Sequence, residues 1–355
     1  MGDKIFFHTN CHDRLIDFIK GLAIIGVILL HNLGHTAVSN YLFFNLWVGM
    51  SVPLFIYVQS INTYRVYKNS AHIEIRDYFR KRTWKMTKRV FIPFIYSQLL
   101  IICLYCLLIG NDVMSLVKTI FISGGLGPGS YYPWAYLQIF ALLPIVIWLY
   151  KKIGPIRTFL LVGGANILFE SICSILGCSE DVFRLLAVRY IFLTVCGIHV
   201  MQTGVHITKT ALIGSIIGMI FIIADSYTSL DFFPLAFKCY GFEGQHWIAY
   251  FYVSYLLIYF IRLLHKILDK LKVSEMIEYY GRDSYTIFVL QLIVFWIFRS
   301  LHYDSYDLSF RTLCFTIMTT LLPLLWSTIV YMTDLLWAKK SINSDMMKQQ
   351  KETVL

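Results

Sequence analysis

Long apolar runs constrain this chain more than any other feature of its sequence. Of its 355 residues, 57% are hydrophobic and only 15% are charged, whereas soluble domains have about 25% charged residues, so a soluble enzyme is excluded. A run of about 20 apolar residues is long enough to cross a bilayer as an α-helix. We therefore predict an all-α transmembrane bundle of about ten spans in one domain, residues 1–340, with a short cytoplasmic tail, residues 341–355. The approximate limits of the predicted spans are 15–35, 41–63, 90–110, 131–150, 158–177, 183–203, 211–227, 246–263, 283–300 and 312–337.

The basic residues lie in short blocks between these runs and give the chain a net charge of +10. In a soluble protein such a charge would suggest nucleic acid, but here it indicates a membrane surface, because cytoplasmic loops keep Lys and Arg. With the N-terminus inside, 25 of the 31 Lys and Arg residues fall on the cytoplasmic side and six on the other. We therefore expect both termini to be cytoplasmic, with membrane lipids as partners and no nucleic acid.

The longest basic segment, residues 64–89, has nine Lys and Arg residues, among them Arg82, Lys88 and Arg89, against two acidic ones. One interpretation is that it sets the topology and contacts anionic lipid headgroups. The other is that it binds a phosphorylated cytosolic ligand, because clustered cations bind phosphate oxygens strongly. Both interpretations stay open from the residues alone.

Ionisable side chains inside a span are costly, so they are candidates for function. Lys20 and His31 in the first span are 11 residues apart, which puts both on one helix face about 16 Å apart along the axis. Arg14 lies at the cytoplasmic boundary. His31 is either a structural histidine or a general base, since imidazole changes its protonation near neutral pH. His31 and His35 have the spacing of a metal pair, but no further ligand can be placed beside them, and we expect no metal.

Five polar residues interrupt later spans: Gln138, Glu170, Arg184, Arg189 and Gln291. Glu170 and Arg189 either pair with each other or contact a substrate in a cavity open to the outer face. Trp134 ends a segment rich in Gly and Pro, which predicts an ordered loop beside an aromatic belt.

The eight cysteines have no framework spacing and are expected to be mostly buried, small apolar side chains. Cys178 and Cys239 both map to the outer side, and whether they pair is left open.

The first span resembles that of the acyltransferase 3 family of integral membrane acyltransferases. The match consists of a basic residue, ten intervening residues and the histidine that is essential in the family, here Lys20 and His31, with neighbouring identities at Arg14, Asp17 and Gly21. Weaker similarities follow in the family's order and cover essentially the whole chain. They are SVPLFIYV at 51–58, KRVFIP at 88–93, GPGSYYPWAYLQ at 127–138, RLLAVRYIFL at 184–193 and GRDSYTIFVLQ at 281–291.

The sequence also departs from the family pattern. Lys20 stands where arginine is common, which keeps the charge but loses the bidentate guanidinium. Gln59 and Ser60 replace a Ser-Gly pair, Met86 replaces a common basic residue, and Gln291 stands where many relatives have histidine.

The resemblance implies a stand-alone O-acyltransferase of the bacterial cytoplasmic (inner) membrane. It implies acyl transfer from a cytosolic acyl-CoA, most simply acetyl-CoA as donor substrate with no bound cofactor. The acceptor would be a sugar hydroxyl of a surface polysaccharide, a lipopolysaccharide or a lipid-linked precursor. His31 would be the catalytic base. The donor would be held by Arg14, Lys20, Arg82, Lys88 and Arg89. The acceptor side would involve Trp134, Gln138, Glu170, Arg189 and Gln291 in binding or structure.

Two other classes of function remain. A transporter or flippase for a polysaccharide precursor would also need a polar path through the membrane, and dependence on CoA would distinguish it from the enzyme. A degenerate relative that only binds partners would explain the departures at Lys20, Gln59 and Gln291.

Overall fold

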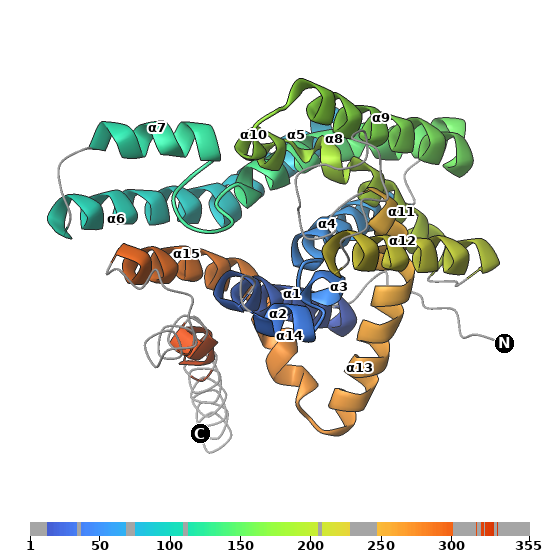
Figure 1. The fold of residues 1–355 in the computed structure, drawn as a ribbon. Helices are drawn as coiled ribbons and strands as arrows, with labels where there is room; N and C mark the ends of the chain where they lie inside the picture. The colour runs from blue at the N-terminus through green and yellow to red at the C-terminus, as the bar shows by residue number, and fades with distance from the viewer. Residues whose placement is uncertain are drawn as a thin grey trace, which may run out of the picture.

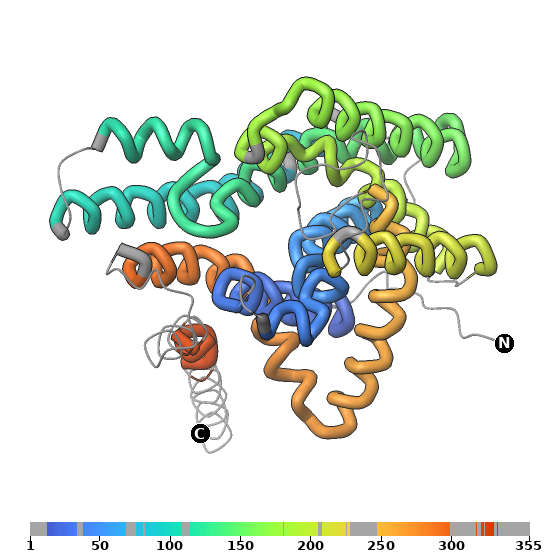
Figure 2. The backbone as a smooth tube through the Cα atoms, viewed as in Figure 1, coloured from blue at the N-terminus to red at the C-terminus, as the bar shows by residue number. Residues whose placement is uncertain are grey.

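Every regular element is helical in the part of the chain that the computed structural model describes. That part comprises residues 13–33, 37–68, 75–108, 113–204, 208–227 and 247–300, with single positions and short stretches between 317 and 332. Figure 1 shows the arrangement of the helices, and Figure 2 traces the same path as a tube.

The helices follow one another along the chain. The elements are α1 (Arg14–Leu33), α2 (Ala37–Tyr41), α3 (Phe44–Trp47), α4 (Ser51–Tyr67), α5 (Ile75–Met86), the π-helix η1 (Thr87–Phe91), α6 (Ile92–Leu108), α7 (Val113–Ser123), α8 (Tyr132–Ile153), α9 (Pro155–Leu176), α10 (Glu180–Leu185), the 3₁₀-helix η2 (Ala187–Tyr190), α11 (Ile191–Thr203), α12 (Lys209–Tyr227), the 3₁₀-helix η3 (Trp247–Ala249), the π-helix η4 (Tyr252–Leu257), α13 (Ile258–Lys270), α14 (Ser274–Arg282) and α15 (Ser284–Ser300).

Six of these helical stretches are long and apolar enough to cross a membrane among the described residues. They are Arg14–Leu33, Phe44–Tyr67, Arg76–Leu107, Tyr132–Ile153, Pro155–Leu176 and Trp247–Lys270. Helices α14 and α15 reach this length only together, and they meet at a bend of 76°, as in a broken span or a re-entrant loop. Six of the ten predicted spans therefore have a counterpart of sufficient length, and seven do if this bent pair is one span.

The predicted span 183–203 is wrong as a single helix, because the chain breaks there into α10, η2 and α11. Leu186 has an extended backbone, with φ of −87° and ψ of 116°. The side chain of Gln138 donates to the carbonyl of Leu185 at 2.7 Å and accepts from the amide of Ala187 at 3.1 Å. These two hydrogen bonds satisfy backbone groups that a continuous helix would have paired internally.

Three further elements differ from the predicted pattern. The predicted span 211–227 corresponds to α12. Its apolar part, like that of α7, has a length of 10–17 residues and is shorter than the six spans named above. Helix α7 itself lies between the predicted spans 90–110 and 131–150. The predicted span 312–337 lies largely outside the described residues.

Two glycines allow α1 and α14 to cross at very close range in the centre of the bundle. A Cβ atom on Gly281 would lie 1.7 Å from the carbonyl oxygen of Asp17, and one on Gly21 would lie 2.0 Å from that of Ile277. Because real Cβ atoms cannot approach a backbone oxygen so closely, this crossing requires glycine at both positions. It fixes the place of Lys20, which lies between Asp17 and Gly21 on α1.

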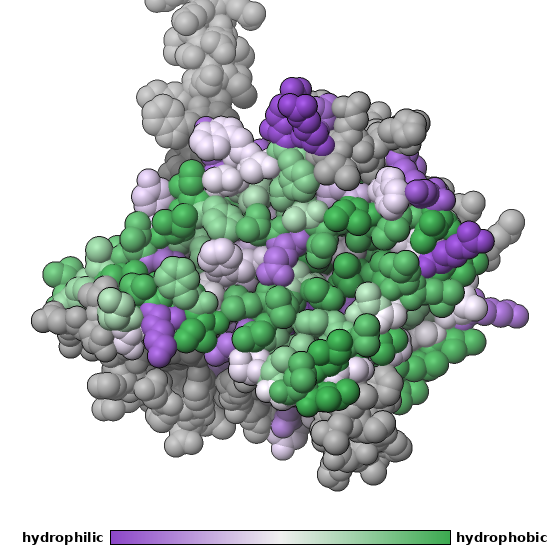
Figure 3. Space-filling model, turned by 90° about the horizontal axis from the view of Figure 1, so that it is seen from above, coloured by the Kyte–Doolittle hydropathy of each residue, from purple (hydrophilic) through white to green (hydrophobic). Residues whose placement is uncertain are grey.

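The outer surface has many exposed apolar side chains, such as Phe121 (81% exposed) and Leu160 (72% exposed). Figure 3 shows a broad hydrophobic area across the face that it presents. Monomeric soluble proteins rarely expose so large an apolar area, so this surface fits contact with lipid. The chain is therefore a multi-pass membrane protein.

Candidate functional site

A cavity of about 740 Å³ runs through the bundle beside α1. Its walls come from α1, residues 49–62 at the start of α4 and just before it, η1, the loop before α8, α10 and the α14–α15 bend. Three cations line one end of it, and His31 of α1 and Asp181 and Arg184 of α10 line the rest.

Three cations from separate elements line the first end of the cavity: Lys20 of α1, Arg89 of η1 and Arg282 at the end of α14. The Lys20 ammonium is 2.6 Å from a carboxylate oxygen of Asp17, one turn earlier on α1. Arg282 was not predicted from the sequence. The sequence feature that could have indicated Arg282 is its position directly after Gly281 in the segment 281–291. Only the close crossing of α1 and α14, however, brings it to the side of Lys20.

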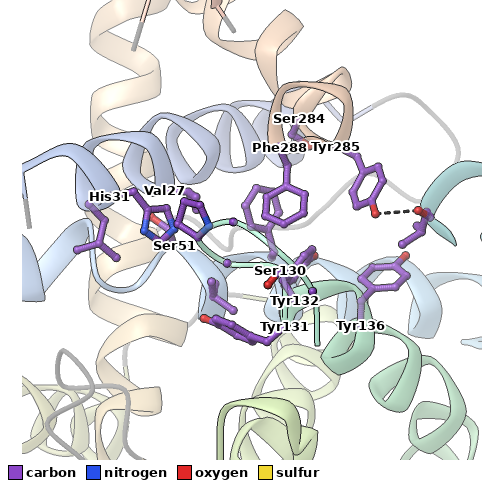
Figure 4. Close-up of a pocket in the computed structure, with 18 of the residues that line it drawn as sticks. Val27, His31, Ser51, Ser130, Tyr131, Tyr132, Tyr136, Ser284, Tyr285 and Phe288 are labelled. Atoms are coloured by element: carbon purple, nitrogen blue, oxygen red, sulfur yellow. Dashed lines mark hydrogen bonds between the residues drawn. The ribbon is translucent and has the colours of Figure 1, made fainter. Parts of the chain in front are cut away.

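The π-helix η1 presents Arg89 to this end of the cavity. Its carbonyl at Val90 accepts a hydrogen bond of 2.8 Å from the hydroxyl of Tyr285, which also lines the cavity. Figure 4 shows this contact as a dashed line beside Tyr136. A π-helical turn leaves the regular α-helical hydrogen-bond pattern, and such turns are frequent at functional sites.

His31 lies in the last turn of α1 and lines the cavity (Figure 4). The ring of Phe295 meets it edge-on, with 6.0 Å between the ring centroids. A Cβ atom on Gly129 would lie 3.4 Å from Nε2 of His31 and 3.3 Å from the ring of Phe288. The backbone of the loop before α8 therefore passes directly over the imidazole.

That loop, residues 124–131, is held by three side chains from three helices. Gln98 of α6 accepts from the amide of Leu126 at 2.6 Å and donates to its carbonyl at 3.3 Å. Trp134 donates to the carbonyl of Gly124 at 2.6 Å, and Gln291 donates to that of Pro128 at 3.2 Å. Four glycines of the loop have positive φ, a conformation that side chains with a Cβ disfavour. The ordered loop that we predicted is thus present, with Trp134 and Gln291 as its supports.

The structure places the predicted donor-binding cations in different surroundings. Lys20 and Arg89 line the cavity. The guanidinium of Arg82 lies over the rings of Tyr67 and Tyr78, and the ammonium of Lys88 lies over that of Trp84; neither is in the cavity wall.

Arg14 belongs to a polar cluster at the start of α1. Its side chain donates to Glu278 at 2.9 Å and to Asp269 at 2.7 Å, and His265 is 2.9 Å from the other oxygen of Glu278. A metal ion could be held by one ligand atom from each of His265, Asp269 and Glu278, because these three atoms lie within 4.8 Å of one another. The guanidinium already supplies a positive charge to both carboxylates, so this geometry favours an ion-pair network over a cation site.

None of the residues predicted on the acceptor side is among those that line the cavity. Glu170 is buried and accepts from the amide of Asn166 at 2.7 Å. Arg189 is fully buried, with its guanidinium against the rings of Tyr190 and Phe183 at 4.4 and 5.3 Å from their centroids. Arg189 belongs to η2, in the broken segment between α9 and α11 whose backbone Gln138 holds. Asp181, which was not predicted, and Arg184 line the cavity at this end.

Two sequence hypotheses fall outside the described residues. His35, the second member of the histidine pair, lies there, and so does Cys239, the possible partner of Cys178.

A family model described as an acyltransferase domain, that of acyltransferase 3, matches residues 13–332. The matched range includes every residue that lines the cavity. A search of curated proteins found no match for the chain.

Proposed function

Because the chain belongs to the acyltransferase 3 family, and is thus a membrane acyltransferase, we propose that it transfers an acetyl group from acetyl-CoA to a sugar hydroxyl. The acceptor is a surface polysaccharide, a lipopolysaccharide or a lipid-linked precursor. The observation that carries this proposal is a single cavity lined by Lys20, Arg89 and Arg282 and also by His31, which lies three helical turns beyond Lys20 on α1.

The cationic end suits the donor. CoA has several phosphate groups, and Lys20, Arg89 and Arg282 provide three positive charges from three directions. Lys20 and His31 are about 16 Å apart along α1 at 1.5 Å per residue. The extended pantetheine arm of the donor would lie along this stretch, with its thioester beside His31.

The chemistry requires a base for the acceptor hydroxyl. The imidazole of His31 takes the hydroxyl proton while the oxygen attacks the thioester carbonyl, and general-base help of this kind is typically worth 10²–10⁴-fold in rate. The new C–O bond forms, the C–S bond breaks, and the departing thiolate of CoA takes the proton from the imidazolium. The backbone of the loop at Gly129 limits the space around the reacting atoms.

The opposite end suits a sugar. Asp181 and Arg184 line it, and Ser130 and Tyr131 of the loop that passes over His31 also line the cavity. Carboxylate, guanidinium and hydroxyl groups together can donate to and accept from sugar hydroxyls. This end would open to the face away from the cytoplasm.

The test is dependence on CoA. The purified protein in liposomes is given acetyl-CoA with a radiolabelled acetyl group together with a candidate glycan, and both the labelled ester and the free CoA thiol are measured. We expect the two products in equal amounts. Movement of the glycan across the bilayer without release of CoA thiol would contradict the proposal and support a transporter.

A further inference from the structure

A second cavity lies on the other side of the bundle, between α9, α11, α12 and the segment 247–255. It has a volume of about 540 Å³ and shares no lining residue with the acyl-transfer cavity. Aromatic rings form most of its wall. Phe159 and Phe192 are 5.7 Å apart between centroids, Phe192 and Phe251 are 5.5 Å apart, and Trp247 and Tyr255 extend the same wall. We call this cavity the aromatic groove.

The aromatic groove opens towards lipid. Leu160 on its rim is 72% exposed, and Ile213 on the neighbouring α12 is 58% exposed. Gly163 and Gly164 remove two side chains from the α9 wall. A Cβ atom on Gly164 would have no other atom within 4 Å, so the space in front of it is open.

Polar groups line one end of the aromatic groove. The hydroxyls of Thr208 and Thr210 are 2.9 Å apart, and Nδ1 of His199 is 2.7 Å from the hydroxyl of Tyr150. Two exposed cations adjoin this end in the sequence. Lys209 lies between the two threonines, and Arg157 lies one turn before Leu160 on α9. An occupant that complements these walls is apolar along most of its length and anionic at one end.

The polar end lies on the side of the bundle where α1 begins. The guanidinium of Arg65, near the end of α4, is 3.0 Å from Asp13, and the ammonium of Lys151, near the end of α8, donates to the carbonyl of Tyr67 at 2.5 Å. Helix α9 starts two residues after α8 ends, so its first turns lie on that same side. This is the side of the cationic end of the first cavity, away from Asp181.

We propose that the aromatic groove binds an anionic glycerophospholipid, with one acyl chain along the aromatic wall and the phosphate beside Thr208 and Thr210. The lipid would come from the leaflet on the side where α1 begins. A lipid-linked acceptor, whose sugar must reach the opposite end of the first cavity, would approach from the other leaflet. The proposal does not depend on the acyl-transfer reaction.

The sharpest test fills the aromatic groove from Gly164. Gly164→Leu places a side chain in open space, whereas the control Ala165→Leu adds the same side chain to the next, exposed position, which does not line the groove. Binding of phosphatidylglycerol to the delipidated protein is measured by native mass spectrometry in detergent. We expect Gly164→Leu to bind the lipid at least about tenfold more weakly. The added side chain takes the place of about two methylene groups of the lipid chain, and burial of two methylene groups is worth that factor. Ala165→Leu should bind as the unmodified protein does.

A second variant tests the headgroup and decides the question if Gly164→Leu fails to fold. Arg157→Gln combined with Lys209→Gln should abolish a preference for phosphatidylglycerol over phosphatidylcholine. Equal binding by Gly164→Leu and the unmodified protein would overturn the proposal, as would equal binding of the two lipids by the unmodified protein. Stronger binding of a polyprenyl phosphate than of phosphatidylglycerol would also overturn it, by assigning the groove to a lipid-linked substrate.

Discussion

The imidazole of His31 lies between the ring of Phe295 and the backbone of Gly129, inside the cavity that also contains the cations. We expect His31→Gln to lower the rate of acetyl transfer by about 10²–10⁴-fold, because Gln keeps a polar side chain but cannot take the proton. His35→Gln is the matched control and should retain most of the activity. The measurement is incorporation of labelled acetyl into the acceptor by monodisperse protein. Normal turnover in His31→Gln would remove the histidine from the mechanism.

Lys20 provides the second residue-scale prediction. Lys20→Met should raise the KM for acetyl-CoA with a smaller effect on kcat, because it removes a cation from the donor end, while Lys20→Arg should retain much of the activity. Lys20→Met also removes the partner that lies 2.6 Å from the buried Asp17. The double variant with Asp17→Asn removes both charges and separates donor binding from this folding effect. An unchanged KM in both variants would mean that the basic position is dispensable.

Single residues also show where sequence reasoning ends. Lys20 and His31 could be placed on one face because they belong to one helix with a fixed rise and rotation. Arg282 could not be placed beside them. It is far from Lys20 along the chain, and only the glycine crossing of α1 and α14 brings the two helices together. The converse holds for Arg82 and Lys88: their positions in the basic segment predicted donor binding, but both lie over aromatic rings outside the cavity wall.

At the scale of elements, the crossing of α1 and α14 should be intolerant of any side chain at Gly281. Gly281→Ala places a Cβ atom against the Asp17 carbonyl, so the helices must separate, and overpacking of this kind typically costs about 1–3 kcal/mol or more. We expect a lower thermal unfolding midpoint in detergent. Gly164→Ala, which meets no neighbour, should instead leave the midpoint unchanged or raise it, because Ala favours a helix. Equal midpoints for the two variants would contradict the close crossing.

The π-helix η1 is the second element with a testable role. Tyr285→Phe removes the hydroxyl that donates to the carbonyl of Val90, and this should let Arg89 shift away from the donor. We expect a higher KM for acetyl-CoA with kcat nearly unchanged. Because Tyr285 acts through Arg89, the double variant with Arg89→Gln should be little worse than Arg89→Gln alone. Additive effects of the two substitutions on KM would show that Tyr285 does not act by positioning Arg89.

Elements differ in how far the sequence predicts them. Most spans were predictable, because crossing a bilayer requires a run of about 20 apolar residues in one helix. The break at Leu186 was not, because the hydrogen bonds that stabilise it come from Gln138, nearly 50 positions earlier. The bend between α14 and α15 and the π-helix η1 likewise have no proline or glycine at the break itself.

At the scale of the whole molecule, the positions of charged groups relate the cavity to the bilayer. Asp13, Arg65 and Lys151 link the ends of α1, α4 and α8 on the side where cations line the cavity. Asp181 and Arg184 lie at the cavity's other end, close to the start of α11. A cytosolic donor and an acceptor on the opposite face could then meet at His31 without either crossing the bilayer completely. This arrangement requires the start of α1 to be cytoplasmic.

The last prediction tests that orientation. Lys272, in the exposed turn after α13, should be cytoplasmic, and Lys118, exposed on α7, should face the opposite side, because 25 of the 31 basic residues then lie inside. Each is changed to cysteine in a background without native cysteines and is treated with a membrane-impermeant maleimide. Lys118→Cys should react in intact cells, and Lys272→Cys only after permeabilisation. If both positions reacted in intact cells, the cationic end of the cavity would face away from cytosolic CoA, and the proposed route of the donor could not operate.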